Sequence, residues 1–395
     1  HGTRWCRVSV RSNRPMTKDS GVCVVTHPLS SAGENATRTL LDVLSAITGV
    51  SLVTANLPGD STIRKHYDIV EVTKKGASQS NVLLAALRFL QNQIRMCQVI
   101  SNRDEDVMLF FGATSYLLPV LFSRFLGKTV ILEPRGDIPL TLRLNWERTL
   151  PTLIARTLAR GVWALERACY HLADGIITYT PAMAAELGVD DFQSKLYPHG
   201  ARYVDTETFA IQTPYSERDH VVGFVGRLDE EKNVRRLARA AHHLPDSITF
   251  RFVGDGPLRE ELEDTTEDNP RIEFSGWVNH DDVPRELNRM CLLVLPSHPT
   301  EGLPTTILES LACGTPVLST PVSGVPDVVQ DGETGFHLRG ETPEAVADAI
   351  QDVFAHSDLE AVSEAGRRLV ENEYSYAAAV ERYRSILERV SDGAP

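Results

Sequence analysis

The sequence has little positive charge and no sign of a metal site or a disulfide framework. It carries 40 Lys and Arg residues against 53 Asp and Glu residues, a formal net charge of −13. Binding to a nucleic-acid backbone needs clustered Lys and Arg, so this balance argues against a nucleic-acid partner. The six cysteines stand far apart, without a C-x-x-C pair or a nearby histidine at zinc spacing. This pattern predicts free thiols in a reducing compartment and no metal site.

Long apolar segments are also missing. The longest apolar run, residues 107–123, is just short of a membrane span and is interrupted by the small and polar residues 112–115. A strand, a turn and a helix explain this run better than a membrane helix does. Residues 1–15 lack the apolar core of a signal peptide, so we expect a disordered arm before a native start at Met16. These absences favour a cytoplasmic protein.

Short β-branched runs alternate with helical segments along the chain, which is typical of parallel sheets covered by helices. The alternation is interrupted by a polar stretch at 212–220 and then resumes. It predicts an α/β protein with two Rossmann-like, doubly wound parallel-sheet domains that face each other across a cleft. The predicted divisions are an arm at 1–15, an N-terminal domain at 16–212, a C-terminal domain at 213–375, and a final helix and tail at 376–395 that packs back on the N-terminal domain.

The most informative segment is the helix start that follows the apolar run CLLVLP. Pro304 suits the first turn of a helix, where its missing N–H is no loss. The free N–H groups of that turn, with the hydroxyls of Thr305 and Thr306, form a pocket suited to a diphosphate. Glu309 lies four residues after Thr305 on the same helix face and can reach a ribose diol. Glu301 precedes the turn and would point at whatever lies beyond the phosphates.

A helix start supplies only partial charge, so a reaction that expels a nucleoside diphosphate also needs full cations. Arg227 and Lys232 lie in the loop that begins at Gly226, between the strand VVGFV and the helix from Asn233. An arginine can bridge two phosphate oxygens, while a lysine acts as a point charge. The pair is therefore predicted to stabilise a diphosphate leaving group without a metal ion.

Further motifs follow these two in a fixed order. They are the GRLxxEK loop at 226–232, Val253-Gly254-Asp255-Gly256-Pro257, Gly276-Trp277-Val278, the pair Glu301 and Glu309, Cys313-Gly314-Thr315-Pro316-Val317, and Asp331-Gly332-Glu333-Thr334-Gly335. With these motifs, the segment 223–335 resembles the donor domain of the retaining glycosyltransferases of family 4, which have the GT-B fold. Several ordered motifs over more than a hundred residues carry this resemblance.

The resemblance implies a role for each matching residue. Glu301 would contact the hydroxyls of the donor sugar, and Arg227 and Lys232 would contact the diphosphate. Glu309 would bind the ribose, and the backbone of Trp277 and Val278 the base. The predicted site consists of the catalytic residues Glu301, Arg227 and Lys232 and the donor-binding residues Gly226, Trp277, Val278, Gly302, Leu303, Pro304, Thr305, Thr306 and Glu309.

The N-terminal half resembles the family only in outline. Gly33 stands where the family often has a glycine pair, and residues 111–113 occupy the place of a sugar-contacting histidine in many relatives. Arg135 follows a predicted strand and is a candidate to face an anionic acceptor. Gly33 and Arg135 are therefore the predicted acceptor-side residues. His27 also follows a strand, and we interpret it as a hydrogen-bonded structural histidine.

These patterns predict transfer of a hexosyl group from a nucleoside diphosphate sugar, with UDP or GDP, to a hydroxyl acceptor, and the resemblance implies retention at the anomeric carbon. No other cofactor is required. Lipid-linked glycans, polysaccharides and small molecules are all open as acceptors. The segment Arg143 to Arg167 indicates either a basic helix on the inner face of an anionic membrane or a core-packed helix with a charged outer face. Alternatives are a GT-B-type epimerase, a sugar phosphorylase, and a non-catalytic subunit that binds a nucleotide sugar.

Overall fold

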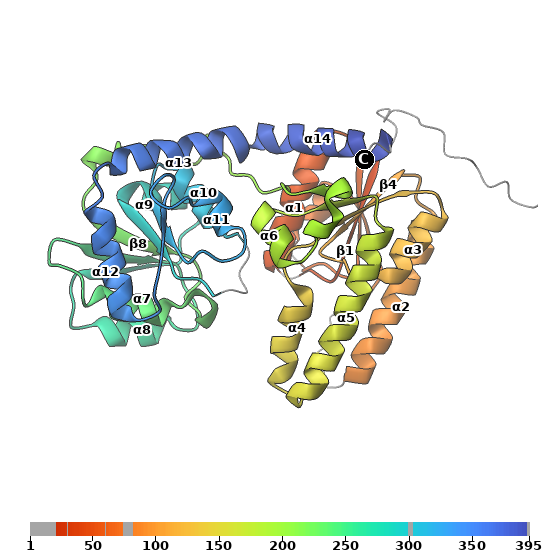
Figure 1. Ribbon diagram of the computed structural model, residues 1–395, viewed down its shortest axis with the longest axis horizontal. Helices are drawn as coiled ribbons and strands as arrows, with labels where there is room; N and C mark the ends of the chain where they lie inside the picture. The colour runs from red at the N-terminus through yellow and green to blue at the C-terminus, as the bar shows by residue number, and fades with distance from the viewer. Residues whose placement is uncertain (1–20, 30, 60, 74–81, 299–302, 393–395) are drawn as a thin grey trace, which may run out of the picture. The chain divides into compact units, whose positions relative to one another are not determined.

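A computed structural model of the chain describes residues 21–29, 31–59, 61–73, 82–298 and 303–392 (Figure 1). These residues divide into two compact units. The first takes its residues from 1–178, 189–197 and 380–395, and the second from 179–188 and 198–379. Each unit is built around one sheet with helices on its faces, which confirms the predicted pair of doubly wound domains.

The first unit contains a seven-stranded sheet in the order β3-β2-β1-β4-β5-β6-β7, in which neighbouring strands are parallel. Its strands are β1 (Val22–Thr26), β2 (Val50–Thr54), β3 (Asp68–Glu71), β4 (Val107–Phe111), β5 (Thr129–Glu133), β6 (Gly175–Ile177) and β7 (Leu196–Tyr197). The central strands β1 and β4 are buried along their whole length because helices cover both faces. The strand order reverses between β1 and β4, which makes this pair the topological switch point of the sheet.

The helices of the first unit are α1 (Ser31–Ser45), α2 (Val82–Ile100), α3 (Leu117–Phe125), α4 (Ile138–Glu147) and α5 (Thr152–Leu172), with the 3-10 turns η1 (Thr62–Lys65) and η2 (Asp190–Lys195). Helix α3 packs between α2 and α5, and α4 packs along α5. The prediction of one continuous helix through Arg143 and Arg167 is wrong. The segment breaks before Pro151, which lacks the N–H that a continuing helix would need. No helix in the described ranges is long and apolar enough to cross a membrane.

The C-terminal helix α14 (Tyr376–Asp392) returns to the first unit, to which residues 380–395 belong. The hydroxyl of the buried Tyr383 donates to the carboxylate of Glu133, at the end of β5, at 2.7 Å. Val390 packs closely over Gly175 of β6, where a Cβ would lie 3.1 Å from Cγ2 of Val390, tighter than an ordinary contact. The predicted packing of the last helix on the N-terminal domain is confirmed.

The second unit contains a six-stranded parallel sheet in the order β10-β9-β8-β11-β12-β13. Its strands are β8 (Val221–Val225), β9 (Thr249–Val253), β10 (Ile272–Gly276), β11 (Leu292–Leu295), β12 (Val317–Ser319) and β13 (Phe336–His337). Its helices are α6 (Pro181–Glu186), α7 (Val234–Ala241), α8 (Arg259–Thr266), α9 (Val283–Arg289), α10 (Thr305–Ala312), α11 (Val325–Val328), α12 (Pro343–Phe354) and α13 (Leu359–Glu373). The order of this sheet reverses between β8 and β11, so its switch point lies at the ends of these two strands.

Candidate functional site

The loop after β8 is fixed by a close contact with the loop after β9. Gly226 has φ of 155° and Gly254 has φ of 136°. A Cβ at Gly254 would overlap the carbonyl oxygen of Gly226, so glycine is what allows the two backbones to meet. The buried Leu228 then joins the loops, because its N–H donates to the Asp255 carbonyl at 2.9 Å and its carbonyl accepts from the Leu258 N–H at 3.0 Å. This contact sets the path of the loop that carries both predicted cations.

Lys232 ends the short 3-10 turn η4 (Glu230–Lys232). Asp229 caps this turn by accepting a hydrogen bond from the backbone N–H of Lys232 at 3.2 Å. The side chain of Arg227 is 66% exposed and forms ion pairs with Asp229 and, at 3.6 Å, with Glu231. The two cations therefore share one short loop, and the arginine is engaged by the largely buried carboxylate of Asp229 and the exposed carboxylate of Glu231.

This loop touches the segment that follows β11. The carbonyl of Glu231 accepts a hydrogen bond from the N–H of His298 at 3.1 Å, and the side-chain amide of Asn233 donates to the carbonyl of Pro296 at 2.8 Å. These contacts form at the β8/β11 switch point, where open α/β sheets bind their ligands. The cationic loop and the segment leading to α10 thus meet at one place.

The predicted helix start is the N-terminus of α10. Pro304 is its N-cap, one residue earlier than the first-turn position that the sequence suggested. Among the described residues, no side chain caps this end or competes for the N–H groups of its first turn. Thr305 is exposed and Thr306 is half-buried. The open helix end and one exposed hydroxyl remain compatible with the predicted diphosphate pocket.

Two predicted site residues, Glu301 and Gly302, lie outside the described residues, and their roles stay predictions. Leu303, the next predicted donor residue, is buried at 1% exposure. Its Cβ lies 3.4 Å from the point where a side chain on Gly324 would begin. The Leu303 side chain therefore anchors the loop in the core, and only its backbone is available for a ligand.

Glu309 lies beside the loop that follows β10. Its Oε1 atom is 3.2 Å from Nε2 of His280, the first residue of η5 (His280–Asp282), and its side chain is 12% exposed. Trp277 in the same loop is 69% exposed, whereas Val278 packs against the core. The structure therefore brings the predicted ribose and base residues together. Sequence reasoning missed His280, whose only signal was its place three residues after Trp277.

The predicted acceptor-side residues lie in the first unit. Gly33 is buried in the first turn of α1, where its carbonyl accepts from the Thr37 hydroxyl at 2.9 Å. The guanidinium of Arg135 lies over the ring of Phe111, 5.3 Å from its centroid. Nδ1 of His27 is buried without a hydrogen-bond partner among the described residues. The hydrogen bond predicted for His27 is therefore not formed at this ring nitrogen.

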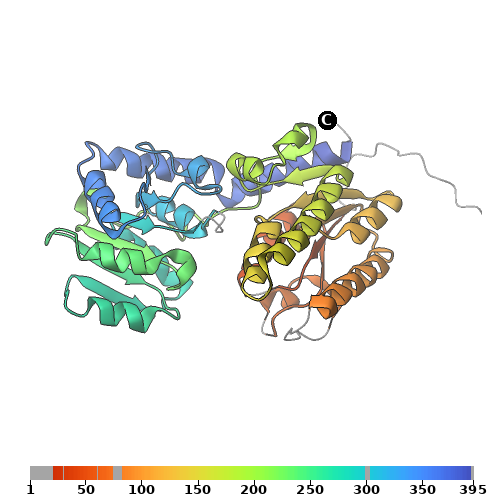
Figure 2. The same ribbon diagram turned by 60° about the horizontal axis from the view of Figure 1, so that its bottom comes forward.

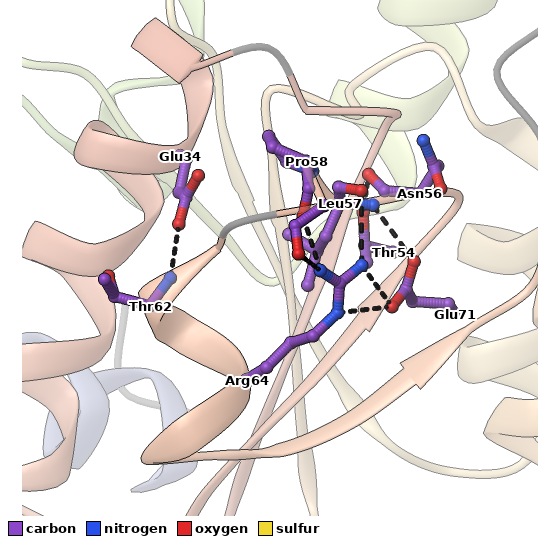
Figure 3. A network of polar contacts seen from close by, with 9 residues as sticks. Glu34, Thr54, Asn56, Leu57, Pro58, Thr62, Arg64 and Glu71 are labelled. Atoms are coloured by element: carbon purple, nitrogen blue, oxygen red, sulfur yellow. Dashed lines mark hydrogen bonds and ion pairs between the residues drawn. The ribbon is translucent and has the colours of Figure 1, made fainter.

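A polar network holds the ends of β2 and β3 in the same unit (Figure 3). Arg64 donates to the carboxylate of Glu71 at 2.8 and 3.0 Å and also to the backbone carbonyls of residues 57–59. Glu34 accepts a hydrogen bond from the N–H of Thr62 at 3.1 Å. Because the hydrogen bonds of Arg64 go to the protein itself, we assign this network a structural role and not a ligand-binding one.

Comparison with known proteins identifies the enzyme class. The family of glycosyl transferases group 1 matches residues 219–356. The alpha-D-kanosaminyltransferase of Streptomyces kanamyceticus is 26% identical over 358 residues, which cover 85% of this chain and 87% of the relative. The alpha-maltose-1-phosphate synthase of Mycolicibacterium smegmatis is 29% identical over 386 residues, which cover 91% of this chain and 95% of the relative. The chain is a glycosyltransferase, and the group 1 family matches its residues 219–356.

The glycosyltransferase also shares its architecture with solved structures. HepE of Anabaena, solved in complex with UDP, superposes with a TM-score of 0.70 at 15% identity, over 92% of this chain and 99% of that one. This likeness confirms the predicted GT-B fold. Within the described part of the glycosyltransferase, no group of three or more His, Cys, Asp or Glu side chains is arranged to hold a metal ion.

Proposed function

We propose that the protein moves a hexosyl group from a nucleoside diphosphate sugar, with UDP or GDP as the nucleotide, to a hydroxyl acceptor with retention at the anomeric carbon. The observation that carries this proposal is the contact between the β8–α7 loop and the segment after β11 at the switch point of the second sheet. Arg227 and Lys232 belong to the loop that comes to this point from β8, and α10 follows the segment that comes from β11. A pyrophosphate suits both features.

The reaction requires the protein to stabilise a departing diphosphate. The bond between the anomeric carbon and the phosphate oxygen breaks, and the acceptor oxygen bonds to the same face of that carbon. The acceptor proton moves to the departing phosphate oxygen. Arg227 exchanges the carboxylates of Asp229 and Glu231 for the diphosphate, and with Lys232 it neutralises the developing charge. Glu301 holds the hydroxyls of the donor sugar.

The nucleoside is bound at the end of the site nearest β10. Glu309 accepts the ribose hydroxyls, and the backbone of Trp277 and Val278 contacts the base. The contact between Glu309 and His280 supports this assignment, because it keeps the carboxylate beside the loop that would hold the base. Thr305 and Thr306 lie one turn before Glu309 and would offer their N–H groups to the pyrophosphate.

Thermal unfolding with a panel of UDP and GDP sugars tests the donor site. A donor at a hundred times its Kd adds about 2.7 kcal/mol to the stability of the folded protein. We expect Lys232→Ala to reduce this effect and to lower kcat by a factor of about 100 or more, because one cation on the leaving group is lost. Arg285→Ala, which changes an exposed arginine on α9, serves as the matched control and leaves both unchanged. Absence of any stabilisation by millimolar UDP or GDP sugars overturns the proposal.

Incubation with labelled donor separates the remaining enzyme classes. An epimerase converts the donor without an acceptor. A sugar phosphorylase leaves the nucleotide sugar unchanged and instead cleaves a glycoside with inorganic phosphate to give a sugar 1-phosphate. A non-catalytic subunit binds the donor but does not turn it over with any acceptor. Glycosyl transfer with retention, measured as an unchanged anomeric configuration in the product, is the outcome that we expect.

We also propose that the protein contacts a membrane surface through the outer face of α2, α3 and α5 (Figure 2). Ten of the 13 large hydrophobic side chains that are exposed in the described ranges lie on or beside these helices. They are Leu87, Leu90, Ile94, Leu118, Leu121, Phe125, Leu126, Leu153, Ile154 and Trp163. On α2 and α3 they recur at spacings of three and four residues, the stripe that a helix normally buries. An exposed apolar patch of this kind marks a binding surface.

The charge of these helices complements an anionic membrane. Helices α2 to α5 together carry seven arginines and two glutamates, in a chain whose net charge is −13. Of the two glutamates, Glu166 is buried and Glu147 lies 3.7 Å from Arg156. Four of the arginines are exposed, namely Arg88, Arg95, Arg156 and Arg160, whereas Arg124 and Arg167 pair with Asp174 and Asp191. These helices therefore combine exposed apolar side chains with exposed arginines, which is the composition of surfaces that bind anionic lipid.

Co-sedimentation of the full chain with vesicles tests this surface. We expect binding to vesicles that contain phosphatidylglycerol, weaker binding in high salt, and little binding to pure phosphatidylcholine. Phe125→Ser and Arg156→Glu should each weaken binding, whereas Arg285→Glu makes the same charge change on the second unit and should not. Equal binding to both vesicle types refutes the proposal. So does a dimer that forms through this face and is lost in Phe125→Ser without any binding to lipid.

A further inference from the structure

Three strand ends meet at the switch point of the sheet in the first unit. Strands β1, β4 and β5 are neighbours, and they are followed by His27, Gly112 and Arg135. Gly112 has φ of 66°. A Cβ at Gly112 would lie 3.1 Å from Cδ of Arg135 and 3.3 Å from Cε1 of His27. Both side chains therefore converge over a position at which only glycine leaves them ordinary room.

Arg135 has no carboxylate partner in the described part of the chain. Its Nε atom is buried without a hydrogen bond among the described residues, and its guanidinium lies over the ring of Phe111. Glu133, two residues earlier, instead accepts a hydrogen bond from Tyr383. A partly buried cation without a counter-charge is costly, and proteins normally avoid it. Arg64 donates its hydrogen bonds to the protein itself, whereas the Nε atom of Arg135 has no acceptor among the described residues. This difference indicates that Arg135 binds a ligand.

His27 supplies a second unsatisfied polar atom at the same place. Burial and then the charge of Arg135 lower the pKa of His27 to about 4, so its ring is neutral at pH 7. A neutral imidazole has one N–H donor, and Nδ1 is the buried atom that lacks a partner. A fixed cation and a neutral ring nitrogen beside it are suited to an oxyanion, which can take a charge-assisted bond from the first and a hydrogen bond from the second.

We propose that His27 and Arg135, converging over Gly112, form an oxyanion-binding site that holds a phosphate or carboxylate group of the acceptor. All residues of this site belong to the first unit, and the assignment of its ligand as the acceptor rests on the proposed glycosyl transfer. The switch point of a parallel sheet is where such ligands bind, which supports the location. The inference narrows the acceptor from any hydroxyl compound to one that carries a negative group near the reacting hydroxyl.

Calorimetric titration of the full chain tests the site with glycerol 3-phosphate, glucuronate and uncharged glycerol as probes. We expect one or both anions to bind and glycerol not to bind, and the stronger anion identifies the group. Arg135→Ala should weaken that binding at least tenfold, and Arg135→Lys should restore part of it. Arg285→Ala, a matched loss of an arginine on the second unit, should bind like the parent protein. Anion binding that is unchanged in Arg135→Ala overturns the inference.

Two further measurements distinguish failure of this inference from failure of the proposed function and test the contact of His27 with the anion. UDP binding by Arg135→Ala should match that of the parent protein, which shows that the variant is folded and that the donor site is intact. Failure of UDP to bind any form would contradict the proposed function while leaving the anion result to stand. In spectra of histidine-labelled protein, the bound anion should raise the pKa of His27, because it adds negative charge beside the ring. A His27 titration that the anion does not move contradicts its contact with the ligand.

Discussion

Replacement of Glu166 by Gln gives the sharpest test of the electrostatics inside the first unit. Glu166 lies on α5 with 6% of its surface exposed, and its carboxylate accepts a hydrogen bond from the hydroxyl of Thr114 just after β4. Burial raises the pKa of Glu166 from its ordinary 4.5 to about 7. The folded protein therefore holds this proton more tightly than the unfolded chain does. Glutamine keeps the shape and the acceptor oxygen but has no proton to lose.

The magnitude follows from the difference between the two pKa values. At 1.36 kcal/mol for each unit, a rise from 4.5 to about 7 corresponds to roughly 3 kcal/mol. Below pH 4.5 the carboxyl is protonated in both states and contributes no pH dependence. As the pH rises from 4.5 to 7, the unfolded chain releases the proton first, and the folded state loses about 3 kcal/mol relative to it. Above pH 7 the penalty is complete and constant.

Unfolding of the first unit in denaturant, followed between pH 4 and pH 8, is the assay. We expect Glu166→Gln to match the parent protein at the acid end and to exceed it by about 3 kcal/mol at pH 8, or roughly 6 to 12 °C in Tm for a unit of this size. Glu388→Gln, a change of an exposed glutamate on α14 in the same unit, is the control. A difference between Glu166→Gln and the parent that stays constant over this range refutes the reasoning, because the effect would then not be ionisation.

Three further substitutions test single contacts. Gly254→Ala places a Cβ onto a backbone oxygen of the neighbouring loop. We expect the unfolding free energy to fall by at least about 2 kcal/mol and UDP binding to weaken. An unchanged unfolding free energy and UDP affinity would mean that the two loops can move apart. Tyr383→Phe removes the hydrogen bond that Tyr383 donates to the buried carboxylate of Glu133. We expect the free energy of unfolding in denaturant to fall by about 1–3 kcal/mol. An unchanged denaturant midpoint would contradict this. His280→Ala removes the contact with the Glu309 carboxylate. We expect UDP binding to weaken several-fold at an unchanged Tm. A UDP affinity equal to that of the parent protein would show that His280 does not orient the carboxylate.

The sequence predicted the features that local patterns determine. The strand that ends before Gly226 and the helix that starts at Thr305 each stand beside their motif, so the loop and the helix start could be placed from the residues alone. The helix break at Pro151 was also readable, but the continuous apolar pattern on both sides suggested a single helix. The convergence of His27 with Arg135 was not readable, because it depends on the lateral order of β1, β4 and β5, which no local pattern contains.

The switch points of the two sheets have the same topology, but the arginine at one is paired with carboxylates and, within the described ranges, the arginine at the other is not. After β8, Arg227 is already paired with the carboxylates of Asp229 and Glu231 in its own loop. In the proposed reaction a diphosphate competes with these carboxylates, which limits how tightly the leaving group is held after transfer. After β5, Arg135 has no carboxylate in the described residues to compete with an incoming anion. In a chain with a net charge of −13, a cation left without a partner at a strand end is an exception to the general excess of acid. Release of product at one site and capture of an anionic group at the other are the tasks that these two states suit.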